Sequence, residues 1–400
     1  MKLLFVNTLY APHAVGGAEK STQWLAEACA QHGHEVSVAT LSQEPEASSA
    51  VLNQVAVHRV PLANFFWPWD GERHRGSPFW HVRDIDNPTM ERHLGEVLDR
   101  VQPDLVHTNA LAGFSVSAWR ACATRRIPII HTQRDYYLLC PNSSMYRHGK
   151  NCAEPCTRCT IFNARKRELS RLVGGVIGIS RHMLDVHQRY QFFPNALFQR
   201  VIPNAYRAAR SAEPQATRPA HAPLRLGFLG RQTPEKGLEV LLAASTRQSA
   251  GRVEVLIAGS GREDYMSGLR AKYPAARFLG YQQPAEFFAQ VDVLVIPSLW
   301  HEPLGRVVVE ANAHGIPVIA ARRGGLPELV QEGVNGFLFE PDSPPELDAA
   351  LEHFLADPSL ASRLRPACLE KAEDFHPAHI AARYLSSYEE LITRPMPAAA

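Results

Sequence analysis

Long apolar runs are missing from this chain of 400 residues. No segment reaches the roughly 18 uninterrupted apolar residues of a membrane-spanning helix. At the N-terminus, only the short apolar run Leu-Leu-Phe-Val follows Lys2, which is too short for the core of a secretory signal and is typical of a first buried strand. We therefore expect a cytoplasmic protein, in which the 7 cysteines are thiols or metal ligands rather than disulfides.

An excess of charge of either sign is also missing. The chain has 42 Lys and Arg against 40 Asp and Glu, which favours neither a nucleic-acid-binding protein nor an acidic solvating one. The near-zero total hides an asymmetry, because residues 1–203 carry a net charge of +5 and residues 204–400 one of −3. We expect the first half to be the one that meets an anionic partner or a membrane surface.

The order of apolar segments predicts two domains. The segments that begin at residues 2 and 224 repeat one pattern, in which an apolar strand, a glycine turn and a helix follow each other. Further short β-branched strands alternate with helices in both halves, which is typical of parallel sheets covered on both faces. We predict an α/β protein with two doubly wound domains facing a central cleft. The predicted parts are residues 1–206, a linker at 207–223, residues 224–376 and a C-terminal helix at 377–395.

The most specific motif lies in the second half. A strand ends at Ile296, a loop carries Glu302, and Gly305 stands at the start of a helix. The N-terminus of a helix offers free N–H groups and the positive end of a dipole, which suits a phosphate. Seven residues separate Glu302 from Glu310, which lies two turns along the same helix. A carboxylate accepts hydrogen bonds from two neighbouring sugar hydroxyls well.

This pattern resembles the paired-glutamate motif of glycosyltransferase family 4, whose members are retaining nucleotide-sugar glycosyltransferases with two Rossmann-like domains, the GT-B fold. The resemblance covers nearly the whole chain. It implies that Glu302 holds the donor sugar and that Glu310 holds the ribose. It also implies that the backbone at Leu304 and Gly305 meets the diphosphate. In similar proteins the second domain binds the donor, the first binds the acceptor, and the last helix packs back on the first domain.

Two further segments fit the resemblance. Arg231 and Lys236 follow Gly230 at the end of an apolar strand, where the family clamps the donor diphosphate with an Arg and a Lys. Two fixed cations stabilise the charge that develops on the leaving group, and no Asp-x-Asp motif stands beside them, so we expect catalysis without a metal. Gly16 and Gly17 let the backbone approach a ligand closely, and in the family this loop lies under the donor phosphates. The alternative is a plain tight turn.

One position departs from the family pattern. Many members have a His-Asp pair near the reacting sugar, and here the aligned residues are Arg134 and Asp135. Arginine cannot act as a base, but it can hold a hydroxyl or a phosphate. Transferases of this type are thought to need no enzymic nucleophile, because the departing phosphate accepts the acceptor's proton. We expect Arg134 to orient donor or acceptor, with Asp135 and the upstream His131 near the acceptor.

Four cysteines have a spacing that is typical of metal ligands. They are Cys140, Cys152, Cys156 and Cys159. Four thiolates suit a tetrahedral structural zinc. The alternatives are reduced thiols in a loop and a redox-labile disulfide.

Residues 64–81 concentrate six aromatic residues, with Trp67 and Trp69 among them, and also hold basic residues. Such a segment suits sugar stacking or a lipid-linked acceptor at a membrane interface. A hydrophobic minicore under a long loop explains the aromatic residues equally well.

Together these features predict a retaining, metal-independent glycosyltransferase. It would move a sugar from a nucleoside-diphosphate-sugar to a hydroxyl of a glycan, lipid-linked or small-molecule acceptor, in the synthesis of a cell-surface polysaccharide or a glycolipid. We expect no nucleic-acid partner, no catalytic cofactor, and peripheral membrane contact through the N-terminal domain on the cytoplasmic face. Two alternatives remain. One is a catalytically silent nucleotide-sugar-binding partner in a glycan assembly complex, which Arg134 keeps open. The other is a GT-B-fold sugar-nucleotide epimerase, against which the glutamate pair argues.

Overall fold

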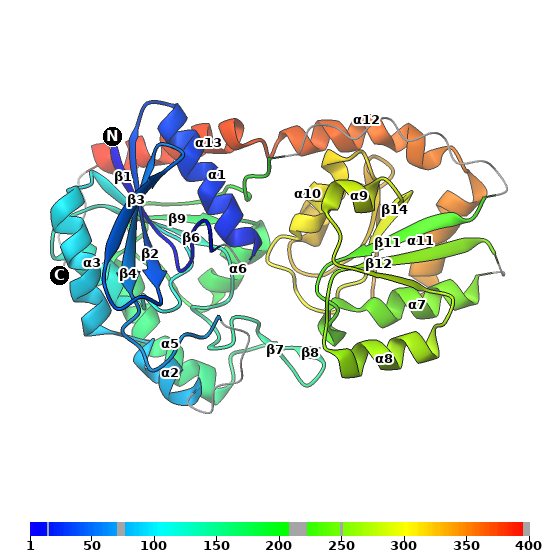
Figure 1. The fold of residues 1–400 in the computed structure, drawn as a ribbon, viewed down its shortest axis with the longest axis horizontal. Helices are drawn as coiled ribbons and strands as arrows, with labels where there is room; N and C mark the ends of the chain where they lie inside the picture. The colour runs from blue at the N-terminus through cyan, green and yellow to red at the C-terminus, as the bar shows by residue number, and fades with distance from the viewer. Residues whose placement is uncertain (14–15, 70–76, 208–221, 249–250, 395–400) are drawn as a thin grey trace. The chain divides into compact units, whose positions relative to one another are not determined.

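The structure, a computed structural model, describes residues 1–13, 16–69, 77–207, 222–248 and 251–394. Its helices and strands divide between two compact units (Figure 1). The first unit consists of residues 1–145, 152–205 and 377–400, and the second of residues 146–151 and 206–376.

An eight-stranded sheet forms the centre of the first unit, within the residues described, in the order β10-β9-β6-β5-β1-β2-β4-β3. The strands are β1 (Lys2–Val6), β2 (Glu35–Ser42), β3 (Ser48–Leu52), β4 (Val55–Pro61), β5 (Leu105–Thr108), β6 (Ile129–Gln133), β9 (Gly175–Gly178) and β10 (Phe198–Val201). All neighbours run parallel except β3, which pairs antiparallel with β4 at the edge. The chain builds this sheet outward from β1 in both directions, so ligands are expected at the carboxyl ends of β1 and β5.

Helices connect the strands of the first unit. They are α1 (Gly17–Gln31), α2 (Ser77–Arg83), α3 (Pro88–Val101), α4 (Ser117–Ala123), α5 (Thr157–Leu169), α6 (Arg181–Arg189) and α13 (Pro377–Thr393), with a 3₁₀ turn η1 (Ser170–Leu172). Asn87 begins α3 by accepting hydrogen bonds from the backbone N–H groups of Thr89 and Met90. The strands between the helices are almost wholly buried, as a parallel sheet requires.

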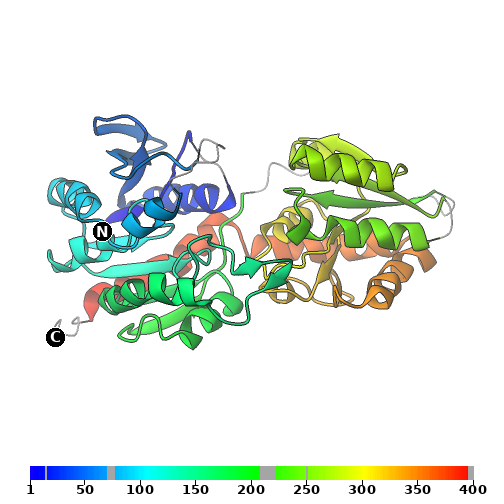
Figure 2. The same cartoon turned by 90° about the horizontal axis from the view of Figure 1, so that it is seen from below.

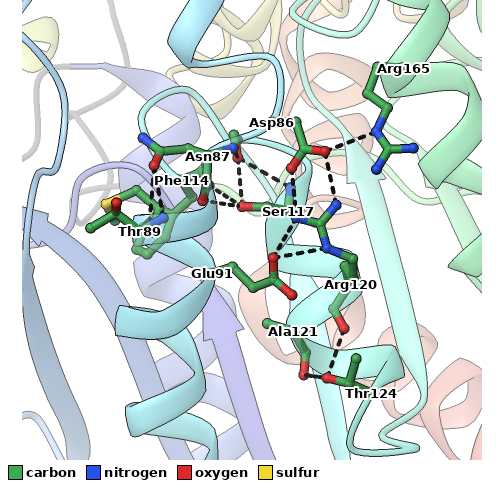
Figure 3. A network of polar contacts seen from close by, with 12 residues as sticks. Asp86, Asn87, Thr89, Glu91, Phe114, Ser117, Arg120, Ala121, Thr124 and Arg165 are labelled. Carbon is green, nitrogen blue, oxygen red and sulfur yellow. Dashed lines mark hydrogen bonds and ion pairs between the residues drawn. The ribbon is translucent and has the colours of Figure 1, made fainter.

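A network of polar contacts ties α3, α4 and α5 together (Figure 3). Arg120 of α4 donates hydrogen bonds to Asp86 at 2.8 and 2.9 Å and to Glu91 of α3 at 2.9 Å. Arg165 of α5 donates to the same Asp86 at 2.9 Å. Burial by itself would raise the pKa of Asp86, but the two guanidinium groups hold that pKa below its ordinary value. Asp86 therefore stays charged and links α4 to α5.

The second unit contains a six-stranded sheet of parallel strands in the order β13-β12-β11-β14-β15-β16. Its strands are β11 (Leu224–Leu229), β12 (Val253–Ala258), β13 (Arg277–Gly280), β14 (Val293–Ile296), β15 (Val318–Ala321) and β16 (Gly336–Phe339). Its helices are α7 (Leu238–Arg247), α8 (Glu263–Lys272), α9 (Pro284–Phe288), α10 (Arg306–Ala313), α11 (Pro344–Ala356) and α12 (Leu360–Glu373), with 3₁₀ turns η2 (Pro234–Lys236) and η3 (Leu326–Glu328). The prediction of two doubly wound α/β sheets is confirmed.

One short hairpin belongs to a different unit from its flanking residues. Strands β7 (Tyr146–Arg147) and β8 (Lys150–Asn151) pair antiparallel and group with the second unit. Figure 2 shows this hairpin beside the loops of that unit. The predicted first domain, residues 1–206, includes this hairpin, which groups with the second unit. Composition reveals linkers between continuous segments and cannot reveal such an exchange. Most of the predicted linker, residues 208–221, and the tail at 395–400 lie outside the described residues.

The last helix, α13, belongs to the first unit and contributes buried polar contacts to its core. The hydroxyl of Tyr388 lies 2.8 Å from Nδ1 of His107, and the hydroxyl of Tyr384 lies 3.1 Å from that of Thr132. Nε2 of His107 lies 2.7 Å from the Thr132 hydroxyl, which connects these two contacts into one network. Among the described residues, no helix combines the length and apolar character that crossing a membrane requires.

Buried histidines make the first unit sensitive to acid. Burial lowers the pKa of His131 to about 3 and that of His187 to about 4, and it lowers the pKa of His107 well below its usual range. In the unfolded chain these side chains take up a proton near pH 6.5. Their contribution to stability is therefore fully present above that pH, and it is lost as the pH falls toward the folded-state values.

Replacing His131 with Gln should weaken this pH dependence. Between pH 6 and pH 5 the free energy of unfolding should fall less steeply than in the parent protein, by about 1 kcal/mol per pH unit, because one fewer proton binds on unfolding. Urea unfolding at a series of pH values measures the slope. His148→Gln, at an exposed histidine, is the control and should keep the parent slope. An unchanged slope for His131→Gln would contradict the neutral, buried state of this ring.

Candidate active site

Glu302 lies in the loop that follows β14 and is only 9% exposed. Nζ of Lys236 is 2.6 Å from its Oε1, and the hydroxyl of Ser298 donates to the same oxygen at 3.2 Å. Its other oxygen, Oε2, has no hydrogen-bond partner in the part of the chain that the structure describes. The carboxylate is therefore held through one oxygen and can accept hydrogen bonds from a ligand through the other.

Gly237 allows the loop that carries Lys236 to press against the end of β14. Its φ is +69°, which favours glycine, and a Cβ atom there would lie 1.9 Å from the carbonyl oxygen of Pro297. A side chain at this position would separate the two loops and withdraw Lys236 from Glu302.

The same two loops are also joined through their backbones. The N–H groups of Leu299 and Trp300 donate to the carbonyl oxygen of Glu235 at 3.0 and 3.2 Å. Nζ of Lys236 lies 4.7 Å from the centre of the Trp300 ring, within the range of a cation–π contact. The ammonium group is thus fixed between a carboxylate and an aromatic ring.

Helix α10 starts at the end of this loop. Gly305 precedes its first residue with a φ of +96°, and a Cβ atom there would lie 2.3 Å from the side chain of Leu326. Leu304 is buried and anchors the entry of the chain into the helix. The first N–H groups of a helix lack acceptors within the helix, so this end offers donors to an anion.

Glu310 lies on α10, and its charge is balanced by a neighbour. Its Oε1 is 2.7 Å from Nε of Arg306, one turn earlier in the helix. The guanidinium of Arg306 lies over the ring of Tyr206, 5.9 Å from its centre. Burial, and then the charge of Glu310, raise the pKa of Tyr206 to about 12, so its hydroxyl remains a hydrogen-bond donor at neutral pH.

Arg231 is exposed directly after Gly230 at the end of β11. Within the described residues, its side chain forms no hydrogen bond and no ion pair. Its guanidinium group is therefore available to an anionic ligand, unlike that of Arg306.

Sequence reasoning missed Asn151, on strand β8 of the hairpin. Its Nδ2 donates to the carbonyl oxygen of Leu299 at 2.7 Å, and its Oδ1 accepts from the N–H of His301 at 2.9 Å. One amide side chain thus binds the backbone on both sides of Trp300, immediately before Glu302. No local sequence signal points to this residue, because it lies 150 positions from His301 along the chain.

In the first unit, Arg134 follows β6 and is 6% exposed. Its Nε donates to Oδ1 of Asn109 at 2.8 Å, and its Nη1 donates to Oγ of Ser21 at 3.3 Å and to Oδ1 of Asn204. Burial lowers the pKa of this guanidinium group. These partners follow β5 and β10 or lie on α1, so the cluster lies at the carboxyl ends of the strands, where open α/β sheets bind ligands.

Gly16 and Gly17 lie at the start of α1, in the same unit as Arg134. Gly16 is the residue before the helix, and its carbonyl oxygen accepts from the N–H of Lys20 at 3.5 Å. Ser21, which accepts from Arg134, lies one turn after Gly17. The structure therefore brings the start of α1 and Arg134 together.

The other two predicted acceptor residues of this segment are placed differently. His131 is 4% exposed in the core, stacked on Phe193 at 5.5 Å and edge-on to Trp119 at 5.2 Å. This position does not fit an acceptor contact, because alternation along β6 turns the ring into the core. Asp135 accepts from the N–H of Tyr137 at 2.8 Å and so stabilises the turn after the strand.

The aromatic segment contains a packed cluster. The rings of Trp67 and Trp69 meet edge-on at 4.9 Å, and that of Trp69 meets Trp80 at 6.2 Å. Trp80 is buried. Phe65 and Phe79, by contrast, are 64% and 70% exposed. Trp80 thus belongs to a minicore, Trp67 and Trp69 pack beside it but stay half-exposed, and these two phenylalanines remain at the surface. Residues 70–76 lie outside the described part.

Three of the four cysteines predicted as zinc ligands lie close together. Sγ of Cys156 lies 3.6 Å from Sγ of Cys159, and burial followed by Cys140 raises the pKa of Cys159 to about 12. Within the described residues, no group of three or more His, Cys, Asp or Glu side chains is placed to hold a metal ion. Cys140 also contacts Cys159, so three of the four cysteines lie near one another, and a structural zinc stays a prediction.

Comparison with known proteins identifies the family. Residues 15–210 match the family described as Glycosyltransferase Family 4, and residues 210–370 match Glycosyl transferases group 1. The chain belongs to glycosyltransferase family 4. An uncharacterised 42.6 kDa protein in the cps region of Klebsiella pneumoniae is 31% identical over 337 residues, which cover 82% of this chain and 87% of that protein. The D-inositol 3-phosphate glycosyltransferase of Corynebacterium efficiens is 28% identical over 395 residues, covering 91% and 88%.

Solved structures share the fold. Sucrose-phosphate synthase from Thermosynechococcus elongatus has a TM-score of 0.75 at 21% identity and covers 98% of both chains. HepE from Anabaena in complex with UDP-glucose has a TM-score of 0.68 at 20% identity, covering 98% of this chain and 100% of that one. The fold of this family member is GT-B, and its enzyme class is glycosyltransferase.

The variant Asn151→Ala should weaken donor binding in this glycosyltransferase. It removes two hydrogen bonds that hold the loop before Glu302, and a loss of that size corresponds to about 5- to 30-fold in affinity. Titration calorimetry with the nucleotide sugar that the parent turns over measures the change. Asn195→Ala removes an exposed bond from an amide side chain to the carbonyl oxygen of Arg171 and serves as the control. Equal donor affinities in Asn151→Ala and the parent would contradict the role of the hairpin.

Proposed function

We propose that this family 4 member is a retaining, metal-independent transferase that moves a sugar from a nucleoside-diphosphate-sugar to an acceptor hydroxyl. The observation that carries the proposal is the Lys236–Glu302 pair, in which one carboxylate oxygen is fixed and the other has no partner among the described residues. A fixed carboxylate with an available oxygen suits sugar hydroxyls, and the neighbouring cations suit a diphosphate.

The proposed reaction needs no nucleophile from the protein. The bond between the anomeric carbon and the diphosphate oxygen breaks, and the leaving nucleoside diphosphate takes the electron pair. The acceptor oxygen attacks the anomeric carbon from the same face and passes its proton to a phosphate oxygen. Arg231, Lys236 and the first N–H groups of α10 stabilise the charge that builds on the diphosphate.

In this proposal each donor-site residue contacts a different part of the nucleotide sugar. Glu302 accepts hydrogen bonds from the sugar through Oε2, and Glu310 accepts from the ribose after its ion pair with Arg306 loosens. Gly305 lets α10 start directly at the phosphates. A uridine nucleotide is the first donor to test, because HepE, which has the same fold, was solved with UDP and with UDP-glucose.

A surface glycan or a lipid-linked acceptor is the proposed destination of the sugar. A structural neighbour is a lipopolysaccharide outer core galactosyltransferase, WaaB, with a TM-score of 0.66 at 15% identity. The exposed Phe65 and Phe79 suit the interface of a membrane, and the guanidinium of Arg83 lies 5.9 Å from the centre of the Phe65 ring.

Glu302→Gln should reduce kcat/KM for the nucleotide sugar by about 100-fold or more, because it removes the charge that orients Lys236 and weakens acceptance from sugar hydroxyls. The assay measures nucleotide release from UDP-, GDP- and dTDP-sugars with and without acceptors. Glu332→Gln, which removes an exposed partner of Arg322 in the same unit, is the control.

The same assay separates the finer parts of the proposal. Retention is checked by the anomeric configuration of the product in NMR spectra, and metal independence by unchanged rates in EDTA. Binding of a nucleotide sugar without turnover, with or without Glu302, would favour the catalytically silent partner. Inversion at the anomeric carbon would contradict the proposed mechanism directly.

Peripheral membrane contact can be tested separately. The double variant Phe65→Ser and Phe79→Ser should lower cosedimentation with vesicles of anionic lipid by several-fold, because it removes two exposed apolar side chains. Val51→Ser, at an exposed apolar residue of the edge strand β3, is the control. Equal sedimentation of all three proteins would contradict contact through this surface.

A further inference from the structure

Arg134 carries a buried charge that no described residue neutralises by an ion pair. Its side chain is 94% enclosed, and all of its hydrogen-bond partners are amide or hydroxyl oxygens without charge. Glu19 and Asp135 act on it only through longer-range electrostatics, after the effect of burial. The cation is therefore oriented by neutral oxygens, and the surrounding residues compensate its charge only partly, without an ion pair.

A buried charge without an ion pair is costly, and arginine cannot remove it by losing a proton. A buried lysine can lose its proton, and Lys166 in the same unit is an example. Burial lowers the pKa of Lys166 to about 8, where loss of the proton is accessible. Arg120 resolves the problem differently, by pairing with Asp86 and Glu91. Neither route is open to Arg134, so a partner of opposite charge has to come from outside the described residues.

The geometry leaves one edge of the guanidinium group available. Nε and Nη1 are used by neighbours, while Nη2 has no hydrogen-bond partner in the part of the chain that the structure describes. Arg134 retains 6% of its surface exposed, so the side chain is not fully sealed from solvent. A guanidinium edge recognises the oxygens of a carboxylate or a phosphate particularly well.

Two further features of this place favour an anion. Arg134 and Asn109 lie at the carboxyl ends of β6 and β5, on the side of the sheet where doubly wound folds bind ligands. Helix α1, of 15 residues, starts at Gly17, one turn from the Ser21 that accepts from Arg134. The carboxylate of Glu19 in its first turn lies near Gly16 and offsets part of the positive end of the dipole, so the guanidinium group is the main cationic feature here.

We infer that Arg134 binds an oxyanion of a substrate, a carboxylate or a phosphate, and so selects a charged donor sugar or a charged acceptor. The identification of the ligand as a substrate rests on the proposed transferase function, whereas the anion site itself does not. The oxyanion has two conceivable sources, the sugar of the donor and the acceptor, and they share the chemistry that Arg134 recognises.

The first experiment tests the anion site without enzyme activity. Its background is the double variant Arg231→Ala and Lys236→Ala, which removes the cations proposed to bind the donor diphosphate. Thermal unfolding is followed against inorganic phosphate. Phosphate should raise the Tm of the background protein, and adding Arg134→Gln should weaken the apparent phosphate affinity at least about fivefold.

Two variants control this measurement. Arg134→Lys, measured at pH 6 so that a buried lysine keeps its proton, should retain most of the phosphate response, which a merely structural role of the side chain would not require. Arg125→Gln removes a guanidinium that is already paired with Asp99 and should leave the response unchanged. A phosphate response that is equal with and without Arg134→Gln would overturn the inference.

The second experiment finds the source of the oxyanion. Two matched pairs are compared in turnover, UDP-glucuronate with UDP-glucose as donors, and myo-inositol 3-phosphate with myo-inositol as acceptors. The parent protein should prefer the charged member of one pair by about 10- to 100-fold in KM, and Arg134→Gln should abolish that preference with a smaller effect on kcat. Equal KM values within both pairs would overturn the assignment to a substrate. Failure of every nucleotide sugar to react would count against the proposed function and leave the phosphate result standing.

Discussion

The contact between Lys236 and Glu302 is the constraint on which the proposed donor site of this protein depends. It joins the loop after β11 to the loop after β14, two neighbouring strands of one parallel sheet. The loops approach closely only because Gly237 has no side chain to strike the backbone at Pro297. The ammonium group of Lys236 also offsets the negative charge of Glu302. A carboxylate close to a diphosphate would repel it, and a carboxylate already paired with a cation does so far less.

The two units use the same edge of a parallel sheet with opposite electrostatics. In the second unit, acidic groups are already paired, Glu302 with Lys236 and Glu310 with Arg306. Such a site suits a neutral sugar and its phosphates, which can exchange one set of contacts for another. In the first unit, the buried Arg134 is surrounded by neutral oxygens. A site of that kind gains most from a ligand that brings a negative charge.

Residues close to strand ends were predictable from sequence, and residues brought in from a distance were not. Glu302, Gly305 and Lys236 each follow an apolar strand within a few positions, so their place in the fold follows from the order of elements. Asn151 reaches the same loop from a hairpin whose flanks belong to the other unit, and no local pattern records that.

The sequence also did not predict in which direction a side chain points or which side chains meet in space. His131 occupies the expected strand, but alternation turns it into the aromatic core, and a motif alignment does not contain that information. The spacing of cysteines along the chain likewise says little about where sulfurs meet, since Cys156 and Cys159 come together without a metal-binding group of three. A turn of helix joins these two, and Cys140, distant along the chain, also contacts Cys159.

The excess positive charge of the first half illustrates why net charge is a weak guide to a binding site. Arg120 and Arg165 share the carboxylate of Asp86, and Arg125 is paired with Asp99. These guanidinium groups connect helices, and the carboxylates beside them balance their charge. What distinguishes Arg134 is the combination of deep burial, neutral partners and an open Nη2 edge, none of which enters a count of charged residues. The energetic demand for an anion therefore arises at one side chain, and it would remain there even if the net charge of this half were zero.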